Sequence, residues 1–366
     1  MPSTIEHVRV ELGSRGYDIE IGTGNMGHLA ERLGVAPNLS SAVVIADANV
    51  VEPHARACLA SLEQAGIPYT LREVAAGERS KAIEEATRLW EELLACGTDR
   101  QTVVVAVGGG VIGDLAGFVA ATYARGIAFY QVPTTLLADV DSSVGGKVGV
   151  NLPGAKNMVG AFWQPRGVLI DTAALTTLPD REYRSGLAEV VKYGVILDAE
   201  FFSFLEENVA AINARDDAVL RQVIARCCRL KADVVEQDEH ETTGVRAALN
   251  YGHTYAHAFE TLCGYGQMLH GEAVAVGMLC ASRLAERLNR IEPEVTQRQA
   301  RLLELLQLPT TPPRLNEHDV LSVMRRDKKT TGGRLRFILP SKMGHVELLN
   351  DVDAADALSA LKADGN

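Results

Sequence analysis

The chain has 366 residues, of which 47% are hydrophobic and 23% are charged, a composition typical of a folded globular protein with room for two domains. Its formal net charge of -11 argues against general binding to nucleic acid or to anionic membranes. No stretch approaches the roughly 20 continuous apolar residues of a membrane span, and the start lacks the apolar core of a secretory signal. The six cysteines show no CxxC spacing, and we therefore expect free thiols in a reducing cytoplasm.

Up to residue 178 the sequence alternates short apolar runs with helical patterns. Strands are expected in the runs SAVVIADANV, TLREVAAGE, QTVVVAVGGG and GIAFYQVPTT, and SKAIEEATRLWEELLACG is typical of an amphipathic helix that ends at Gly97. Strands that alternate with helices predict a parallel sheet with helices on its faces. Residues 1–178 are therefore predicted to form an α/β domain.

From residue 179 onward the strand signals fade and helical patterns follow one another. Helices are expected at residues 181–196, 199–212 and 217–238, around the two histidines of LNYGHTYAHAFE, and at residues 271–288. A short strand, RLRFILP, and a last helix over residues 354–364 complete the pattern. Residues 179–366 are therefore predicted to form a mostly α-helical domain.

A glycine-rich loop lies where the third of these strands meets the next helix. The run VVVAVGGGVIGDLAG carries Gly108, Gly110 and Gly113 in a G-x-G-x-x-G pattern, which lets a backbone approach a pyrophosphate at a helix N-terminus. The same glycines would also form an ordinary tight turn. The acidic residue usually found about 20 positions later is missing, and the best strand-end acid is upstream, at Asp47. We predict a Rossmann-like nucleotide-binding domain whose topology differs from that of a standard dehydrogenase.

A long polar segment follows, QVPTTLLADVDSSVGGKVGVNLPGAKNMVGAFWQP. Its aliphatic and aromatic residues indicate that it is packed rather than solvated, and packed polar groups need partners. A bound ligand would supply partners for the polar side chains of this segment. These side chains are Thr134, Thr135, Asp141, Lys147, Lys156 and Asn157.

Three histidines raise the question of a metal site. His253 and His257 are four residues apart in a helical run, so that they share a face, and His270 begins a second helical run. Neutral imidazoles and a carboxylate are zinc ligands, and Glu189, with Lys192 on the same helical face, is the best candidate carboxylate. Helical geometry favours His253 and His257 as its partners, but the pattern leaves the choice open. Ordinary side chains of a helical domain are the alternative.

Seven phrases of the chain resemble the 3-dehydroquinate synthase family, in the same order and over nearly the whole length. They are GGGVIGDLAGFVAATYARG, VPTTLLADVDSSVGGKVGVN, KNMVGAFWQP, GLAEVVKYG, LNYGHTYAHAFE, LHGEAVAVGM and RDKK. The resemblance implies one divalent metal ion, zinc or cobalt, bound by Glu189, His253 and His270. This ligand set has His270 in place of His257, the histidine that helical spacing favours. The resemblance places His257 near the substrate phosphate instead, where it takes part in proton transfer. Between Lys231 and Arg246 the chain is one residue longer than the usual family pattern.

The resemblance also assigns roles residue by residue. It implies that NAD is bound by Asp47, Asn49, Glu78, Lys81, Gly109, Gly110, Asp114, Thr134, Thr135, Asp141, Lys147, Lys156 and Thr177. Substrate contacts fall on Arg125, Lys147, Lys156, Asn157, Lys192, Lys231, Arg246, Asn250, His257, Lys328 and Lys329, with Arg125 reaching the phosphate site of a neighbouring subunit. The catalytic residues among them are Asp141, Lys147, Asn157, Lys192 and His257.

The implied reaction is the conversion of 3-deoxy-D-arabino-heptulosonate 7-phosphate to 3-dehydroquinate and phosphate, a carbon–oxygen lyase step of the shikimate pathway. It runs through transient oxidation at C5, phosphate elimination, re-reduction, ring opening and aldol closure. The resemblance further implies a cytoplasmic homodimer without nucleic-acid or membrane partners. The alternatives are another sugar-phosphate cyclase, of the 2-deoxy-scyllo-inosose or valiolone type, a metal-dependent polyol dehydrogenase that would release NADH, and a non-catalytic scaffold.

Overall fold

The computed structural model describes residues 5–34, 38–153, 155–264, 266–326 and 335–362. It divides the chain into two compact units, one formed by Met1–Pro179 and Leu220–His240 and the other by Asp180–Val219 and Glu241–Asn366. The segment Leu220–His240, which the sequence places in the helical domain, thus packs with the first unit. Among the described helices none is long and apolar enough to cross a membrane. All six cysteines are free thiols.

The first unit is built on a seven-stranded sheet in the order β1-β2-β9-β6-β5-β3-β4. Only β1 pairs antiparallel, with β2, and the other neighbours pair parallel. The predicted α/β fold with a parallel sheet is therefore confirmed. The strands are β1 (Glu6–Val10), β2 (Tyr17–Gly22), β3 (Ala42–Asp47), β4 (Tyr69–Val74), β5 (Val103–Gly108), β6 (Ala128–Pro133) and β9 (Gly167–Asp171).

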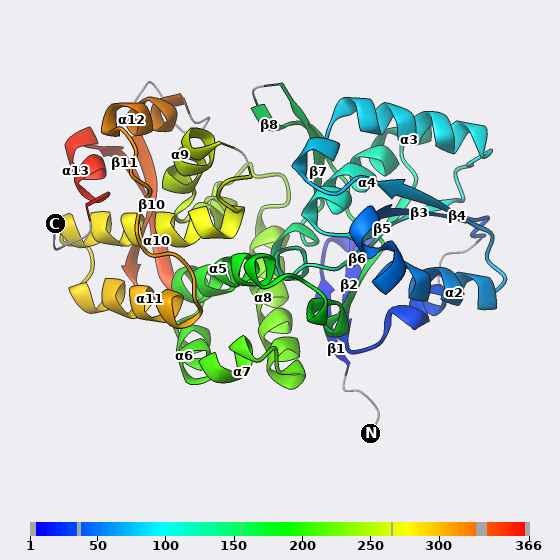
Figure 1. Ribbon diagram of the computed structural model, residues 1–366, viewed down its shortest axis with the longest axis horizontal. Coiled ribbons are helices and arrows are strands. Elements are labelled where there is room, and N and C mark those ends of the chain that lie inside the picture. The colour runs from blue at the N-terminus through cyan, green and yellow to red at the C-terminus, as the bar shows by residue number, and fades with distance from the viewer. Residues whose placement is uncertain (1–4, 35–37, 154, 265, 327–334, 363–366) are drawn as a thin grey trace. The chain divides into compact units, whose positions relative to one another are not determined.

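Helices cover both faces of this sheet, because alternate residues of its strands point to opposite sides. Val44 and Val105 pack with α1 (Leu29–Leu33) and α2 (Arg56–Gln64) on one face. Val43 and Val104 pack with α3 (Ile83–Ala95) and α4 (Gly110–Thr122) on the other. Figure 1 shows α2 on one side of the strands and α3 and α4 on the other. Strands buried on both faces explain the continuous apolar runs of the sequence.

Two further elements complete the first unit. A hairpin of β7 (Lys147–Leu152) and β8 (Ala155–Phe162) packs against α4. All but the first three residues of the long helix α8 (Asp217–Gln237) belong to this unit as well. Short 3-10 or π turns connect the elements: η1 (Gly13–Arg15), η2 (Met26–His28), η3 (Ala48–Val50), η4 (Val51–Ala55), η5 (Glu78–Ser80), η6 (Tyr123–Arg125), η7 (Ala138–Ser142) and η8 (Thr172–Thr176).

The second unit is a helical assembly around α10, and its mostly α-helical character confirms the sequence prediction. Helix α10 is buried along most of its length and packs against α5, α9, α11 and the strand β10. The helices are α5 (Asp180–Leu197), α6 (Ala199–Glu207), α7 (Val209–Asn213), α9 (His253–Cys263), α10 (His270–Arg287), α11 (Pro293–Leu305), α12 (Glu317–Arg326) and α13 (Ala354–Ser359). A 3-10 helix, η9 (Val245–Asn250), and the hairpin of β10 (Leu335–Lys342) and β11 (His345–Val352) complete the unit.

Candidate metal and nucleotide sites

Three helices of the second unit bring one carboxylate and two imidazoles together. Glu189 on α5 is completely buried, and its Oε1 lies 3.7 Å from Nε2 of His253 on α9 and 3.6 Å from Nε2 of His270 on α10. The three potential ligand atoms lie within 4.8 Å of one another. His257, which helical spacing favoured, is not part of this group, although its ring centroid is 5.6 Å from that of His253.

Glycines at two positions allow these helices to approach so closely. A Cβ atom on Gly271 would lie 1.8 Å from the backbone oxygen of Ser185, so only glycine lets the start of α10 meet α5. Gly252, directly before His253, has a φ of 79°, and a Cβ there would lie 2.7 Å from the backbone nitrogen of Met278 on α10. The two glycines therefore bring His253 and His270 to Glu189.

Hydrogen bonds and charges around the three side chains set their protonation. Nδ1 of His253 lies 3.0 Å from the carbonyl oxygen of Tyr251, to which it donates as the neutral imidazole, so that Nε2 is left as the lone-pair nitrogen. Burial lowers the pKa of His270, but hydrogen bonds to Glu189 and Glu260 outweigh burial and raise that pKa to about 10. The ammonium of Lys192, also buried, forms an ion pair with Oε2 of Glu189.

This donor set fits a divalent metal ion. Two imidazole nitrogens and one carboxylate oxygen form a ligand set of catalytic zinc sites. In a tetrahedral zinc site with bonds of about 2.1 Å, neighbouring ligand atoms lie about 3.4 Å apart. The separations of 3.6 and 3.7 Å from Oε1 of Glu189 come close to that value. Lys192 pairs with Oε2 of Glu189, and a cation at this point would meet the other oxygen, Oε1, between the two imidazoles.

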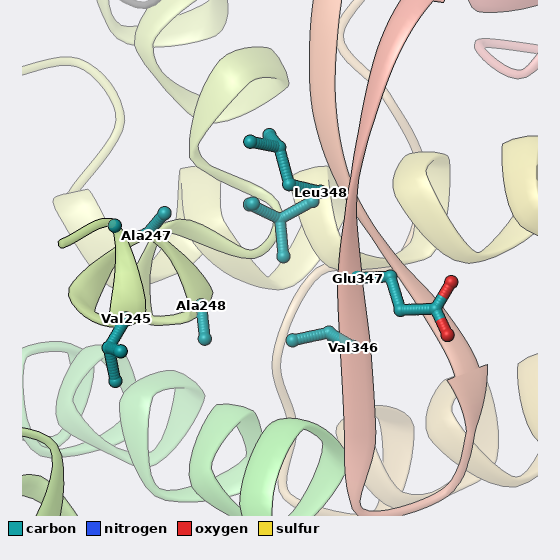
Figure 2. A pocket seen from close by; sticks show the side chains of 8 residues that line it. Val245, Ala247, Ala248, Val346, Glu347 and Leu348 are labelled. Atoms are coloured by element: carbon teal, nitrogen blue, oxygen red, sulfur yellow. The ribbon is translucent and has the colours of Figure 1, made fainter.

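The remaining candidates of the second unit lie on η9, α5 and α9. Arg246 is buried on η9, with its Nε 3.7 Å from Oε1 of Glu241, and Asn250 is the last residue of the same 3-10 helix. Between η9 and the hairpin β10–β11 lies a cavity of about 220 Å³, lined by residues of both elements (Figure 2). None of the three candidate metal ligands lines this cavity, and it is therefore separate from the metal site.

In the first unit, candidate nucleotide residues follow three neighbouring parallel strands. Asp47 ends β3, Gly109 and Gly110 follow β5 and begin α4, and Thr134 and Thr135 follow β6. The chain goes from β3 outward to β4 and then returns to the other side of β3 for β5, so the strand order reverses at this point. Ligands of open α/β sheets bind outside the carboxyl ends of the strands at such a reversal.

Contacts among these residues leave little room for side chains at the glycine-rich loop. A Cβ on Gly109 would lie 3.0 Å from Cγ2 of Thr135, and one on Gly110 would lie 3.0 Å from Oγ of Ser142. Glycine at both positions therefore lets the start of α4, whose first N–H groups have no partner within the helix, lie close to Thr135 and Ser142. Asp47 accepts a hydrogen bond of 2.9 Å from the backbone of Asn49.

A buried lysine links two of the other predicted residues. Nζ of Lys81 lies 2.5 Å from Oδ2 of Asp114 and 2.5 Å from Oδ1 of Asn157. Burial raises the pKa of Asp114, and Lys81 opposes that shift. Glu78 accepts a hydrogen bond of 2.8 Å from the amide of Asn151, which also accepts one from the backbone of Asn157. The turn η5 and the hairpin are thereby joined into one polar network.

The other candidates of the first unit lie on or beside α8, η7, η8 and η6. Lys231 on α8 is buried and donates to the carboxylate of Asp141 on η7 over 2.6 Å. Thr177 lies after η8, with its hydroxyl 2.6 Å from Nε2 of His54. Arg125 ends η6 as an exposed residue with a φ of 66°.

Lys147 begins β7, and Lys156 lies on β8. The two remaining predictions, Lys328 and Lys329, lie outside the described residues. Sequence reasoning missed one residue of the second unit: Glu260, whose carboxylate lies 3.5 Å from Nδ1 of His270. Its position two helical turns after His253, on the same face, is the signal that could have found it.

Comparison with known proteins identifies the class. Residues 71–185 match the family description 3-dehydroquinate synthase N-terminal, and residues 186–330 match 3-dehydroquinate synthase C-terminal. A 3-dehydroquinate synthase of Rhodopirellula baltica is 48% identical over 369 residues, which cover 99% of this chain and 98% of that protein.

Two solved structures are similar over nearly their whole length. A 2-deoxy-scyllo-inosose synthase, complexed with carbaglucose-6-phosphate, NAD+ and Co2+, aligns with a TM-score of 0.87 at 28% identity and covers 97% of this chain and 99% of its own. The 2-epi-5-epi-valiolone synthase of Streptomyces hygroscopicus subsp. jinggangensis, with NAD+ and Zn2+, aligns with a TM-score of 0.86 at 28% identity, over 94% of this chain and 95% of its own.

Fold and relatives together define a sugar-phosphate cyclase with a Rossmann-like first unit. Within that class, the chain belongs to the 3-dehydroquinate synthase family. The resemblance stated from the sequence is thus confirmed, and so is the enzyme class, a carbon–oxygen lyase that converts 3-deoxy-D-arabino-heptulosonate 7-phosphate to 3-dehydroquinate and phosphate.

Proposed function

We propose that this chain carries out that conversion with NAD as a recycled oxidant and with one zinc or cobalt ion bound by Glu189, His253 and His270. The observation that carries the proposal is the convergence of these three side chains from three helices, with their ligand atoms within 4.8 Å of one another. Two similar cyclases contain NAD+ together with Co2+ or Zn2+ in their solved structures, which supports the same pair of cofactors here.

When bound, NAD would supply a reversible hydride acceptor and the metal ion a Lewis acid, which are the two kinds of chemistry that the side chains lack. Glu189 contributes the negative charge of the ligand set, and Lys192, ion-paired to it, lies where its ammonium can also contact an anionic substrate group. His257, one helical turn after His253, holds or moves a proton near the substrate phosphate.

In the first unit, the open backbone N–H groups at Gly109 and Gly110 bind the NAD pyrophosphate, and Asp47 and Asn49 bind the ribose side. Lys81 and Asp114 hold the nicotinamide end in place through their ion pair. The remaining predicted NAD contacts are Glu78, Thr134, Thr135, Asp141, Lys147, Lys156 and Thr177. Charged and amide groups at strand ends suit a ligand of this size and polarity.

The substrate carries a carboxylate and a phosphate, which call for cations in an otherwise acidic chain. Arginine forks bind such groups with two hydrogen bonds, whereas lysine acts as a point charge. In the second unit Arg246, Asn250, Lys192 and His257 take this role. In the first unit Lys147, Lys156 and Lys231 take this role, with Asn157 as a hydrogen-bond donor and Asp141 as an acceptor for substrate hydroxyls. Lys328 and Lys329 are further candidates outside the described residues.

The proposed assembly is a cytoplasmic homodimer in which Arg125 contacts the phosphate site of the other subunit. Free thiols at all six cysteines suit a reducing compartment. An exposed arginine held in a left-handed backbone conformation is available to another chain. Light scattering after size-exclusion chromatography tests this assembly, and a monomer at working concentration would contradict it.

The reaction is tested by a paired assay. Purified enzyme is mixed with 3-deoxy-D-arabino-heptulosonate 7-phosphate, a catalytic amount of NAD and zinc or cobalt, and phosphate release is followed together with the absorbance of NADH. We expect stoichiometric phosphate release without lasting NADH, because the hydride is returned in each cycle. Accumulating NADH would indicate a dehydrogenase, and no phosphate release would indicate a cyclase for another sugar phosphate.

A further inference from the structure

Glu260 is a buried carboxylate whose location calls for an explanation. It lies on α9, two turns after His253, and only 8% of the residue is exposed. Its Oε2 is 3.5 Å from Nδ1 of His270, on the side of that ring opposite to Glu189. Burying a carboxylate is costly unless it meets positive charge or hydrogen-bond donors, and the imidazole of His270 is such a group within reach.

The two nitrogens of His270 therefore point to two different carboxylates. Nε2 lies 3.6 Å from Oε1 of Glu189, and Nδ1 lies 3.5 Å from Oε2 of Glu260. A ring that donates its Nδ1–H to a carboxylate has its tautomer chosen, and the lone pair of Nε2 is then left for a metal ion. The ring is also held in a fixed orientation, although 33% of its side chain remains exposed.

His253 provides a comparison within the same site. Its Nδ1 donates over 3.0 Å to the carbonyl oxygen of Tyr251, a neutral acceptor. Both imidazoles are thus held through Nδ1, but only His270 has a charged acceptor. A negative charge behind the ring makes Nε2 a stronger donor to a cation and adds to the field of Glu189.

We propose that Glu260 is a positioning residue for the metal ion, acting through His270 by selecting its tautomer, orienting its ring and raising its basicity. This role rests on the proposed function, because it requires that the ion bind Glu189, His253 and His270. Removal of an outer carboxylate of this kind weakens metal binding by about 10- to 100-fold.

The test uses the metal-free full-length protein and three variants. Glu260→Ala removes the acceptor, Glu260→Gln keeps an acceptor oxygen but removes the charge, and Glu286→Gln, on the same helix as His270, is the control for the loss of one negative charge. The dissociation constants of Co2+ and Zn2+ are measured by chelator competition, and the visible spectrum of bound Co2+ reports the ligand geometry. Melting temperatures of the metal-free proteins are recorded beside them.

We expect Glu260→Ala to weaken Co2+ binding by about 10- to 100-fold and to change its spectrum, with a smaller loss in Glu260→Gln and none in Glu286→Gln. Metal affinity and spectrum equal to those of the control, with or without a lower melting temperature, would reduce Glu260 to a structural residue and overturn the proposal. Failure of the unchanged protein to bind either metal would instead overturn the metal assignment of the proposed function, and this role with it.

Discussion

The candidate metal ligands of the second unit and the strand-end candidates of the first unit differ in depth and in origin. In the second unit Glu189 is completely buried and meets His253 and His270 from three different helices. In the first unit Asp47 is half-buried, Asn49 and Glu78 are exposed, and all three lie at or shortly after the ends of strands. A small cation requires a few atoms held at fixed separations, whereas a dinucleotide is long and is recognised largely by backbone groups at one edge of a sheet.

The largest expected effect on metal binding and on phosphate release comes from replacing Glu189, the buried carboxylate of the second unit. Glu189→Gln keeps the shape of the side chain but removes the charge from the ligand set and leaves Lys192 without its ion-pair partner. Because loss of an outer carboxylate alone costs about 10- to 100-fold, we expect loss of this ligand to reduce metal binding and phosphate release by more than about 100-fold. Elemental analysis and the phosphate assay measure both, with the exposed Glu182→Gln on the same helix as control. Full activity in a metal-free preparation of the variant would contradict the assignment.

A second change tests whether NAD binding in the first unit is independent of metal binding in the second. Lys81→Met keeps the apolar stem of the side chain but removes the ammonium that contacts Asp114 and Asn157. Hydrogen bonds to charged groups are worth about 1.5–3 kcal/mol, so we expect NAD affinity to fall by about 10- to 100-fold. Metal content should not change, since the ligands lie in the other unit. Calorimetric titration with NAD measures the first quantity, with Arg79→Met as the exposed control. A parallel loss of metal would show that the two sites are not independent.

A third change alters how closely α5 and α10 approach without replacing a proposed metal ligand. Gly271→Ala places a methyl group against the backbone oxygen of Ser185, and the start of α10 must move away from α5. Overpacking of this kind costs about 1–3 kcal/mol in the free energy of unfolding, and we expect metal affinity to fall by roughly tenfold as His270 moves from Glu189. Gly27→Ala, where an added Cβ meets nothing within 4 Å, is the matched control. An unchanged melting temperature in Gly271→Ala would rule out this explanation of the glycine.

Replacing Asp139 is expected to have the smallest effect on the two sites, but to change the free energy of unfolding in a way that depends on pH. Asp139 on η7 is 1% exposed, and burial, with the nearby Asp171 carboxylate, raises the pKa of its carboxyl well above the usual value. Above the unfolded pKa of about 3.9 the folded chain holds a proton that the unfolded chain releases. The free energy of unfolding therefore falls as pH rises, by about 1.4 kcal/mol per unit, until the raised folded pKa is reached.

Asp139→Asn removes this proton linkage. We expect the variant to match the unchanged protein near pH 4 and to become progressively more stable than it as the pH rises above that value. Urea unfolding at several pH values measures the difference, and Glu84→Gln, an exposed carboxylate in the same unit, should show no such trend. A difference that does not vary with pH would mean that Asp139 is ionised in the folded protein.

The sequence predicted the central strands well and the glycine-rich ones poorly. The runs around β3, β5 and β6 are apolar and continuous because these strands are buried on both faces. The segment of β7 and β8 was interpreted as a packed polar segment, yet it is a hairpin whose strands pair at Gly149 and Gly160. A Cβ on Gly149 would lie 2.6 Å from the backbone oxygen of Val159, so the close pairing of β7 and β8 requires glycine. Glycine weakens the pattern of a strand, and for this reason the sequence of these two strands resembles that of a loop.

Other strands were missed for a different reason. The sequence did not predict β1, β2 and β9, which form one side of the sheet. The runs of β1 and β9 have only five residues each, and runs of that length carry little periodicity with which to distinguish strand from loop. Strand β9 joins the sheet by pairing with β6, β2 pairs with β9 and β1 with β2, so their place depends on strands that are distant in the chain.

The sequence by itself determined the residue types needed for each chemistry, the strand ends and the glycine-rich loop, because these follow from local periodicity and turn chemistry. Through the family phrases it also determined the enzyme class. The family phrases also implied the ligand set Glu189, His253 and His270, which the tertiary structure brings together, but only the tertiary structure showed that Glu260 lies behind His270. Helical spacing relates residues within one helix and therefore favours His257, whereas the distance between two helices is set by side-chain volume at their contact, here by Gly271 against Ser185.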